Sequence, residues 1–445
     1  MKTRLKSRIY ISDVIPVLVF IIIFTSSDTL FFGTNKQVAF QKSGQIIDAV
    51  IALLLPGIIY CCKNKCSIKN KNIIAAIAMI GSILISAAVN HDFRAGIFFR
   101  IILIVLGMEI VELISLKDFC RVFYKIITFF AGCSVVGMLA LRTIPGVSVH
   151  SIPLLNSENY SYWYYILYVQ EAGEPMYARN YGIFREPGIF QMFLIAAMFI
   201  GLQYGDLKGT KMKMSMSILF MALLLTRSTT GFFALILFAI FFLSKNNCFK
   251  ERKKIQWMFF GVTTSIIVFL LISPLVWDKF VIWLTDILRK FDRTNSGYAS
   301  FYARYSSITV NLLLWMKNPL FGIGLTKHDG YFSSMAMQFY GIPNSSNTNT
   351  LLSQFAAFGI VFGTVWMISL AAFSYRLGKN AVERFLVFLT LTILLVTENV
   401  SFSPVWNIFM WYGLTLVRIP DKTLGLQPVR RITFAKEADC VYKSW

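Results

Sequence analysis

Hydrophobic residues fill this chain in long, nearly unbroken blocks separated by short polar stretches. About twelve blocks are long enough to cross a bilayer as a helix, which takes roughly 20 apolar residues. They occupy residues 12–32, 44–62, 72–90, 96–115, 121–142, 187–204, 212–227, 229–244, 257–276, 350–374, 383–399 and 403–418. The pattern predicts an all-α polytopic membrane protein with about twelve transmembrane helices and two long loops, about 143–186 and 277–349, that contain amphipathic helices.

The second loop has helical periodicity of its own. Apolar positions spaced as on a helix in 278–293 predict an amphipathic helix that lies on the membrane or packs on the ends of the spans. After a break at Ser296-Gly297, a second helix is expected over about 299–316. Its polar stripe is formed by Ser300, Arg304, Ser307 and Asn311, and an adjacent apolar stripe by Phe301, Tyr305, Ile308 and Leu312.

Composition agrees with a membrane protein, and the charge pattern predicts its topology. Of the 445 residues, 56% are hydrophobic and 15% are charged, more apolar surface than a soluble core absorbs. The net charge is +21, but the basic residues cluster in alternate connections, at 2–8, 63–71, 117–125, 208–213, 245–254, 376–384 and 418–443. Basic residues concentrate on the cytoplasmic side of membrane proteins. We therefore expect cytoplasmic termini, two outer loops, and contact with anionic membrane lipids rather than nucleic acid.

The chain is expected to form one membrane domain, 1–419, followed by a basic cytoplasmic tail, 420–445. The first span has no small-residue cleavage site after it, which indicates a retained anchor. No cysteine lies in a long outer loop, so no disulfide framework is expected there. Cys61, Cys62 and Cys66 lack a nearby His or fourth Cys, so we expect no metal site.

Hydrolase, metalloprotease and nucleotide-binding motifs are absent, which leaves arginines and scattered carboxylates as candidate chemistry. Arginine suits phosphate because it is always charged, planar and bidentate. Arg179, Arg185 and Glu186 precede the sixth span, Arg227 lies in a very short turn between two spans, and Arg304 lies on the polar stripe. The alternative is structural: Glu186 caps a helix and the arginines snorkel to the interface.

Several motifs in the second half resemble the O-antigen polymerase and O-antigen ligase superfamily of polytopic glycosyltransferases. They are Arg179-x-x-Gly182-Ile183-Phe184-x-Glu186-Pro187, Leu225-Thr226-Arg227-Ser228, Ser296-Gly297 followed by Arg304, Asn318-Pro319-Leu320-Phe321-Gly322-Ile323-Gly324, and Thr348-Asn349-Thr350. The resemblance covers roughly residues 175–400. One departure is Thr348, which stands where ligases of the family carry a His before the Asn. The resemblance therefore favours the polymerase branch.

The resemblance implies a site for a glycan linked to polyprenyl diphosphate, at the outer face of the bacterial plasma membrane. No metal site is visible in the sequence, so metal-independent chemistry without a cofactor is the simpler assumption. Arg227 and Arg304 would bind the diphosphate, assisted by Arg179 or Arg185. Glu186 is the first candidate for the carboxylate that orients or deprotonates the acceptor hydroxyl, and Asp329 is the second. Asn349 and His328 are further candidate substrate-binding residues, although an exposed His in such a loop is usually solvated. Flippase and chain-length regulator proteins are implied partners.

Two other functions remain open. A ligase would transfer the finished glycan to a different acceptor. A flippase or transporter for the same lipid-linked sugar would place charges in mid-membrane and show two similar halves. In the fourth span, Arg100 and Glu112 are expected to snorkel to opposite surfaces, which leaves Glu109 as the unexplained charge.

Overall fold

The computed structural model describes residues 11–33, 38–63, 69–143, 152–155, 161–165, 168–171, 179–245, 296–341 and 347–415. The first half contains α1 (Ile11–Phe24), α2 (Leu30–Gly33), α3 (Val38–Lys63), α4 (Asn70–Asn90), α5 (Ala95–Leu113) and α6 (Leu116–Thr143). Strands β1 (Ile152–Leu155), β2 (Ser161–Tyr165) and β3 (Tyr168–Glu171) follow. The second half contains α7 (Pro187–Tyr204), α8 (Gly209–Leu225), α9 (Thr229–Lys245), α12 (Ser296–Lys317), α13 (Leu325–Tyr340), α14 (Thr350–Leu377), α15 (Ala381–Thr397) and α16 (Pro404–Leu414).

Long apolar helices indicate a membrane-embedded protein, as expected. Within the described residues, 4 helices are long and apolar enough to cross a bilayer: α4, the 116–140 part of α6, α7 and α14. Shorter apolar helices lie at Val14–Phe24, Ser43–Gly57 and Thr229–Ser244. The full set of twelve spans stays a prediction. The expected span 257–276, the amphipathic helix 278–293 and the basic tail lie outside the described residues.

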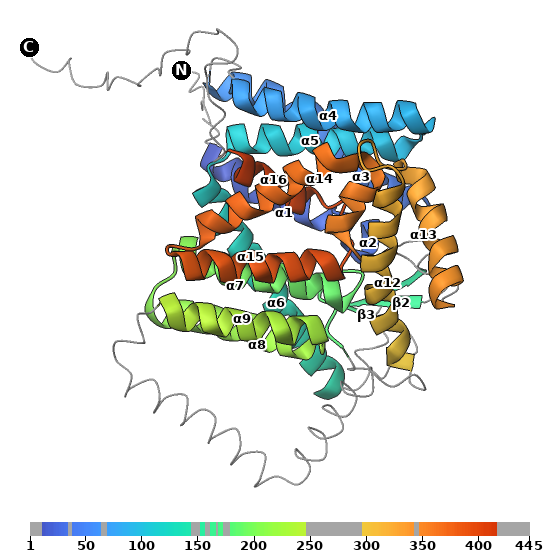
Figure 1. Ribbon diagram of the computed structural model, residues 1–445. Coiled ribbons are helices and arrows are strands. Elements are labelled where there is room, and N and C mark those ends of the chain that lie inside the picture. The colour runs from blue at the N-terminus through green and yellow to red at the C-terminus, as the bar shows by residue number, and fades with distance from the viewer. Residues whose placement is uncertain are drawn as a thin grey trace, which may run out of the picture.

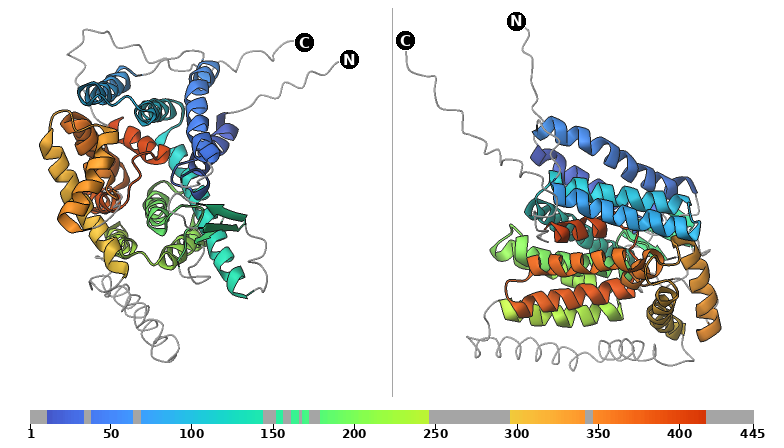
Figure 2. Two further views of the ribbon diagram at one scale, coloured as in Figure 1. Left: turned by 90° about the vertical axis from the view of Figure 1, so that its right-hand side faces the viewer. Right: turned by 45° about the horizontal axis from the view of Figure 1, so that its top comes forward.

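Helix α7 is the centre of the bundle. Fifteen consecutive residues, from Pro187 to Gly201, are buried, so other parts of the protein cover this helix on every side. It packs against α6, α8, α9, α14 and α15. Most helices run side by side, while α12 and α13 lie across one end of the bundle (Figure 1; Figure 2). We call this the site end; it also contains the N-terminus of α7.

The expectation of an amphipathic helix in the loop 143–186 is wrong for its described part. Strands β1, β2 and β3 form an antiparallel sheet in the order β1-β2-β3, with Ile152 opposite Tyr164 and Tyr162 opposite Glu171. The β2 sequence Ser-Tyr-Trp-Tyr-Tyr is rich in aromatic residues, which favour strands over helices.

Helix α12 confirms the second predicted helix of the loop 277–349, but it begins earlier than expected. Ser296-Gly297 forms its first turn rather than a break before it. The polar stripe faces inward, where Ser307 and Asn311 are fully buried. The apolar stripe faces outward, with Tyr305 48% and Leu312 37% exposed. This inverted amphipathic pattern is suited to a helix whose outer face meets lipid and whose inner face lines polar contacts.

The Asn-Pro-Leu-Phe-Gly-Ile-Gly segment fits into a break in α14. Gly359 has φ 82° and ψ −175°, which interrupts the helix and frees backbone groups on both sides. The Ile360 N–H donates to the Pro319 carbonyl at 2.9 Å, and the Ile323 N–H donates to the Ala356 carbonyl at 2.9 Å. The segment therefore satisfies the broken helix and attaches α12 and α13 to α14.

Candidate active site at the N-terminus of helix α7

An arginine–glutamate pair lies at the site end. Arg304 Nη2, on α12, lies 2.9 Å from Oε1 of Glu398, in the connection between α15 and α16. The Glu398 side chain is 2% exposed, whereas that of Arg304 is 27% exposed. A buried carboxylate therefore holds a guanidinium that is still reachable from outside.

Glu398 also lies against the first turn of α7. A Cβ placed on Gly188 would lie 2.0 Å from Glu398 Oε1, so this glycine makes room for the carboxylate. Glu186 is the N-cap residue of α7, but its side chain makes no capping hydrogen bond. Its carboxylate is 49% exposed and lies 3.3 Å from Arg185 Nη1. The Glu186 side chain therefore does not cap the helix, which was the alternative to a role in chemistry.

Electrostatics couple these groups. Burial lowers the pKa of the Arg304 guanidinium. The attraction and hydrogen bond to Glu398, together with the attraction to Glu186, outweigh this effect, so the pKa lies above its ordinary value. Arg304 therefore keeps its charge. Arg185 adds a second cation and is fixed by a 2.9 Å hydrogen bond from Nη2 to the Asn399 carbonyl. Two cations and two carboxylates meet at the positive end of the central helix.

A second arginine group lies at the turn between α8 and α9. Arg179 Nε donates to the Thr226 carbonyl at 3.3 Å. The Asn180 N–H donates to the Leu225 carbonyl at 2.9 Å. Arg227, next in the turn, is exposed and has a φ of 51°, an unusual value for a residue other than glycine. The segment from Arg179 to Glu186 therefore runs from this group to the Arg304–Glu398 pair.

The polar stripe of α12 continues inward from Arg304. One turn further, Ser307 Oγ accepts hydrogen bonds from the Thr348 N–H at 3.0 Å and from the Thr348 hydroxyl at 3.1 Å. Another turn on, Asn311 Oδ1 lies 2.6 Å from His328 Nε2. Because the Asn311 amide nitrogen donates to Asn347 Oδ1, its oxygen faces His328, so the His328 Nε2–H is the donor. The predicted stripe is thus a continuous set of contacts.

Two predicted substrate-binding residues, His328 and Asn349, are buried and form hydrogen bonds within the protein. His328 lies on α13 and is 2% exposed, so the expectation of a solvated loop histidine is wrong. Its contact with Asn311 joins α13 to α12. Asn349 is fully buried and caps α14 by accepting the Leu352 N–H at 2.8 Å. Its Nδ2 has no hydrogen-bond partner among the described residues.

Glu398 is a residue of this site that the sequence pattern did not indicate. Its one signal was a lone carboxylate at the very end of the predicted span 383–399. Asp28 was missed as well: it is 1% exposed, and its carbonyl accepts the Arg185 N–H at 3.0 Å. Both residues come from connections that gather at the site end, a grouping that no local pattern reveals.

Snorkelling was the wrong expectation for Arg100. Its side chain is 1% exposed and donates to Gln354 Oε1. Its guanidinium lies 5.5–5.7 Å from the ring centres of Phe362, Trp366 and Phe402. The ion is therefore enclosed by aromatic faces.

The acidic residues of α5 are also buried. Glu112 is 8% exposed and accepts a hydrogen bond from Asn72 Nδ2 at 2.6 Å, so snorkelling does not describe it either. Glu109 is 4% exposed, and its Oε2 has no hydrogen-bond partner among the described residues.

Within the described residues, no group of three His, Cys, Asp or Glu side chains is placed to hold a metal ion. Comparison of the sequence with protein-family models and with curated proteins finds no match.

Proposed function

We propose that this protein is a membrane glycosyltransferase that polymerises polyprenyl-diphosphate-linked oligosaccharide repeat units into a polysaccharide at the outer face of the bacterial plasma membrane. The observation that carries the proposal is the Arg304–Glu398 pair beside Arg185 and Glu186 at the N-terminus of α7. A helix N-terminus with two arginines favours an anionic group such as a diphosphate.

In the proposed reaction, a hydroxyl of the acceptor sugar attacks the anomeric carbon of the donor glycan. The glycosidic C–O bond forms while the bond from the anomeric carbon to the phosphate oxygen breaks. Polyprenyl diphosphate leaves with the electron pair, and the hydroxyl proton passes to the exposed carboxylate of Glu186. A general base of this kind contributes roughly 10² to 10⁴-fold to a rate.

The arginines stabilise the leaving group. Arg304 neutralises the diphosphate, and Glu398 is its positioning residue because it fixes the guanidinium without blocking it. Arg185 assists from the same cluster, while Arg179 and Arg227 attract the anionic substrate at the neighbouring turn. Asn349 and His328 support the site by holding the ends of α14 and α13. Flippase and chain-length regulator proteins would act before and with this step.

Thr348 favours polymerisation over ligation. Its hydroxyl lies 3.1 Å from Ser307 Oγ, one helical turn from Arg304. A histidine at such a position could exchange protons near neutral pH, whereas a threonine hydroxyl cannot. A reaction that needs this histidine is therefore not supported here.

The test uses a strain that lacks the native gene, complemented with the wild-type protein, Arg304→Lys or Arg376→Lys. Lysine keeps the charge and the attraction to Glu398 but loses the bidentate donors. Loss of one charge-assisted hydrogen bond, about 1.5–3 kcal/mol, lowers the rate roughly ten- to hundredfold, so short chains are expected on a gel. Arg376 donates to Thr415 Oγ1 at 3.1 Å, away from the site, and Arg376→Lys should give normal polymer.

The uncomplemented strain separates the function classes. Single repeat units on the normal acceptor are the expected result. Complete polymer that stays on its lipid carrier would indicate a ligase, and repeat units held on the cytoplasmic side a flippase. Polymer of normal length from Arg304→Lys would contradict the diphosphate contact.

A further inference from the structure

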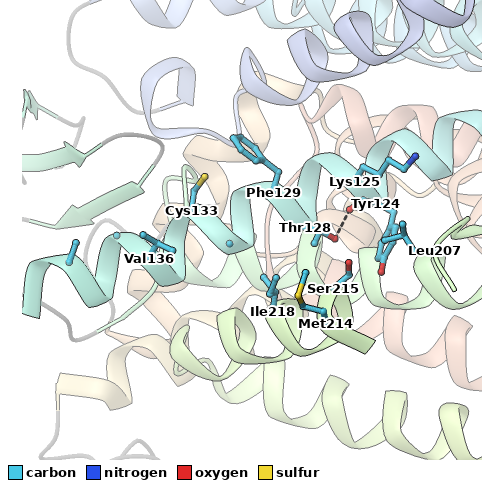
Figure 3. Close-up of a pocket in the computed structure, with 13 residues that line it drawn as sticks. Tyr124, Lys125, Thr128, Phe129, Cys133, Val136, Leu207, Met214, Ser215 and Ile218 are labelled. Atoms are coloured by element: carbon cyan, nitrogen blue, oxygen red, sulfur yellow. Dashed lines mark hydrogen bonds between the residues drawn. The ribbon is translucent and has the colours of Figure 1, made fainter. Parts of the chain in front are cut away.

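A hollow runs along the bundle between α6 and α8, away from the site described above. Its volume is about 640 Å³, and apolar side chains form most of its walls (Figure 3). Phe129, Gly132 and Val136 line it from α6, and Met214 and Ile218 line it from α8. The lining positions on α6 extend from Tyr124 to Ala140, so the hollow is an elongated groove rather than a round pocket.

The groove opens onto the outer surface of the bundle. Phe129 is 53%, Val136 65% and Met214 61% exposed, so large apolar side chains border the opening. Because residues 116–140 of α6 are long and apolar enough to cross a bilayer, we expect this surface to face hydrocarbon. An elongated apolar groove on such a surface has the shape to hold one lipid chain, which is retained there by van der Waals packing because the surrounding lipid is equally apolar.

One end of the groove is strongly basic. Lys125 lines the groove at this end, and its Nζ lies 2.8 Å from Asp206 Oδ2. Arg121 precedes Lys125 by one helical turn on α6, and Lys211 precedes Ser215 by one turn on α8, so both lie beyond the end of the lining.

Nearby carboxylates do not cancel this positive charge. Residues 116–125 and 205–213 contain six basic side chains and two carboxylates, at Asp118 and Asp206. Both carboxylates have partners, since Asp118 Oδ2 accepts from Ser115 Oγ at 2.6 Å and Asp206 is bound to Lys125. Basic pockets of this kind between membrane helices recognise anionic lipid head groups.

We propose that this groove is a binding site for an anionic phospholipid, with one acyl chain between α6 and α8 and the phosphate head group at Lys125, Arg121 and Lys211. The charge excess at one end selects an anionic over a zwitterionic head group. The site is independent of the proposed transferase reaction, because its basic end lies at the opposite end of α7 from Glu186: Tyr204, at the C-terminus of α7, precedes Asp206 by two residues.

Native mass spectrometry of the purified full chain, with added phosphatidylglycerol or phosphatidylcholine, tests the site. Phosphatidylglycerol should bind more tightly. Each basic residue near an anionic head group is worth roughly fivefold in affinity, so Lys211→Gln should weaken phosphatidylglycerol binding about fivefold. Adding Lys125→Gln with Asp206→Asn, which avoids an unpaired carboxylate, should weaken it further. Lys379→Gln removes an exposed lysine away from the groove and should have no effect.

Gly132→Leu tests the chain part of the groove. A Cβ on Gly132 has 3.9 Å to Ile218 Cγ2, so a larger side chain enters the groove without displacing the backbone. This variant should reduce binding of both lipids, while Gly81→Leu, on a surface with nothing within 4 Å of the added Cβ, should not. Equal binding of both phospholipids, or unchanged binding in Lys211→Gln and Gly132→Leu, would overturn the proposal. The proposal would also be overturned if a polyprenyl phosphate displaced phosphatidylglycerol and this displacement was lost in Gly132→Leu but unchanged in Lys211→Gln.

Discussion

Among single residues, Gly188 shows most directly how the backbone makes room for chemistry. It lies in the first turn of α7, where an alanine would normally be the better helix former. The missing side chain lets the Glu398 carboxylate approach the N-terminus of the helix, where the dipole stabilises negative charge. Arg304 is held in place through this carboxylate, so the position of the cation depends on the size of residue 188.

Gly188→Ala should therefore reduce glycan polymerisation while the protein still reaches the membrane. The added Cβ would lie 2.0 Å from Glu398 Oε1, so the carboxylate must move and Arg304 moves with it. A misplacement of about 1 Å in a catalytic group costs roughly a hundredfold in rate. Polymer yield per amount of membrane-inserted protein is the measurement.

A shorter carboxylate gives the matching rescue. Combining Gly188→Ala with Glu398→Asp should restore part of the activity, because aspartate leaves space for the new methyl group. Gly81→Ala is the control glycine, since nothing lies within 4 Å of its added Cβ. Full activity of Gly188→Ala would show that the position of Glu398 does not matter for the reaction.

At the scale of elements, the break in α14 explains a motif that carries no titratable side chain. Gly322 and Gly359 both have positive φ, and each lies against the backbone of the other segment. A Cβ on Gly322 would lie 2.5 Å from the Ala357 carbonyl oxygen, and a Cβ on Gly359 would lie 2.0 Å from the Leu320 carbonyl oxygen. The Ser86 hydroxyl adds a third element by donating to the Ala357 carbonyl at 2.9 Å. The motif thus serves to fix α12, and with it Arg304, against α14.

Gly359→Ala should destabilise the protein more than any substitution of an exposed glycine. The backbone conformation alone costs on the order of 1–3 kcal/mol for a residue with a Cβ, and the contact with Leu320 adds to this. Thermal unfolding in detergent should show a clear fall in midpoint. Gly330→Ala, where the added Cβ meets nothing within 4 Å, should raise it slightly because alanine favours the helix. A midpoint equal to wild type for Gly359→Ala would mean that the break is not required.

Local periodicity predicted α12, but it could not predict contacts between residues that are far apart in the sequence. The stripe of Arg304, Ser307 and Asn311 follows from helical spacing, so its inward-facing contacts could be anticipated. Its partner Glu398 lies 94 residues away in sequence, at the end of an apolar block, and only the packing of α12 against α14 and α15 brings it near. The strands in 152–171 were missed because their aromatic residues also fit a membrane-interface belt.

Across the whole molecule, buried polar groups connect helices that are far apart in sequence. Arg100 on α5 reaches Gln354 on α14, and Gln354 Nε2 donates to Ser401 Oγ at 2.9 Å in the connection before α16. Thr350 extends this set of contacts to the site, since its hydroxyl donates to the Glu398 carbonyl at 2.6 Å. A cation in the bundle interior is costly unless its surroundings compensate it. Here an amide oxygen and three aromatic faces do so.

This environment predicts that the conservative substitution of Arg100 is the more harmful one. Arg100→Lys keeps a compact, strongly hydrated charge that cannot stack flat on three rings, and its burial without an anion costs several kcal/mol. Arg100→Met removes the charge and leaves Gln354 Oε1 unsatisfied, at about 1–3 kcal/mol. In detergent, the unfolding midpoint should therefore fall in the order wild type, Arg100→Met, Arg100→Lys. At the half-buried Arg376 we expect the opposite order of the two variants: Arg376→Lys should be more stable than Arg376→Met, because lysine remains hydrated there. If Arg100→Lys proves as stable as wild type, the guanidinium is not held by the aromatic rings, and the link from α5 to Glu398 loses its physical basis.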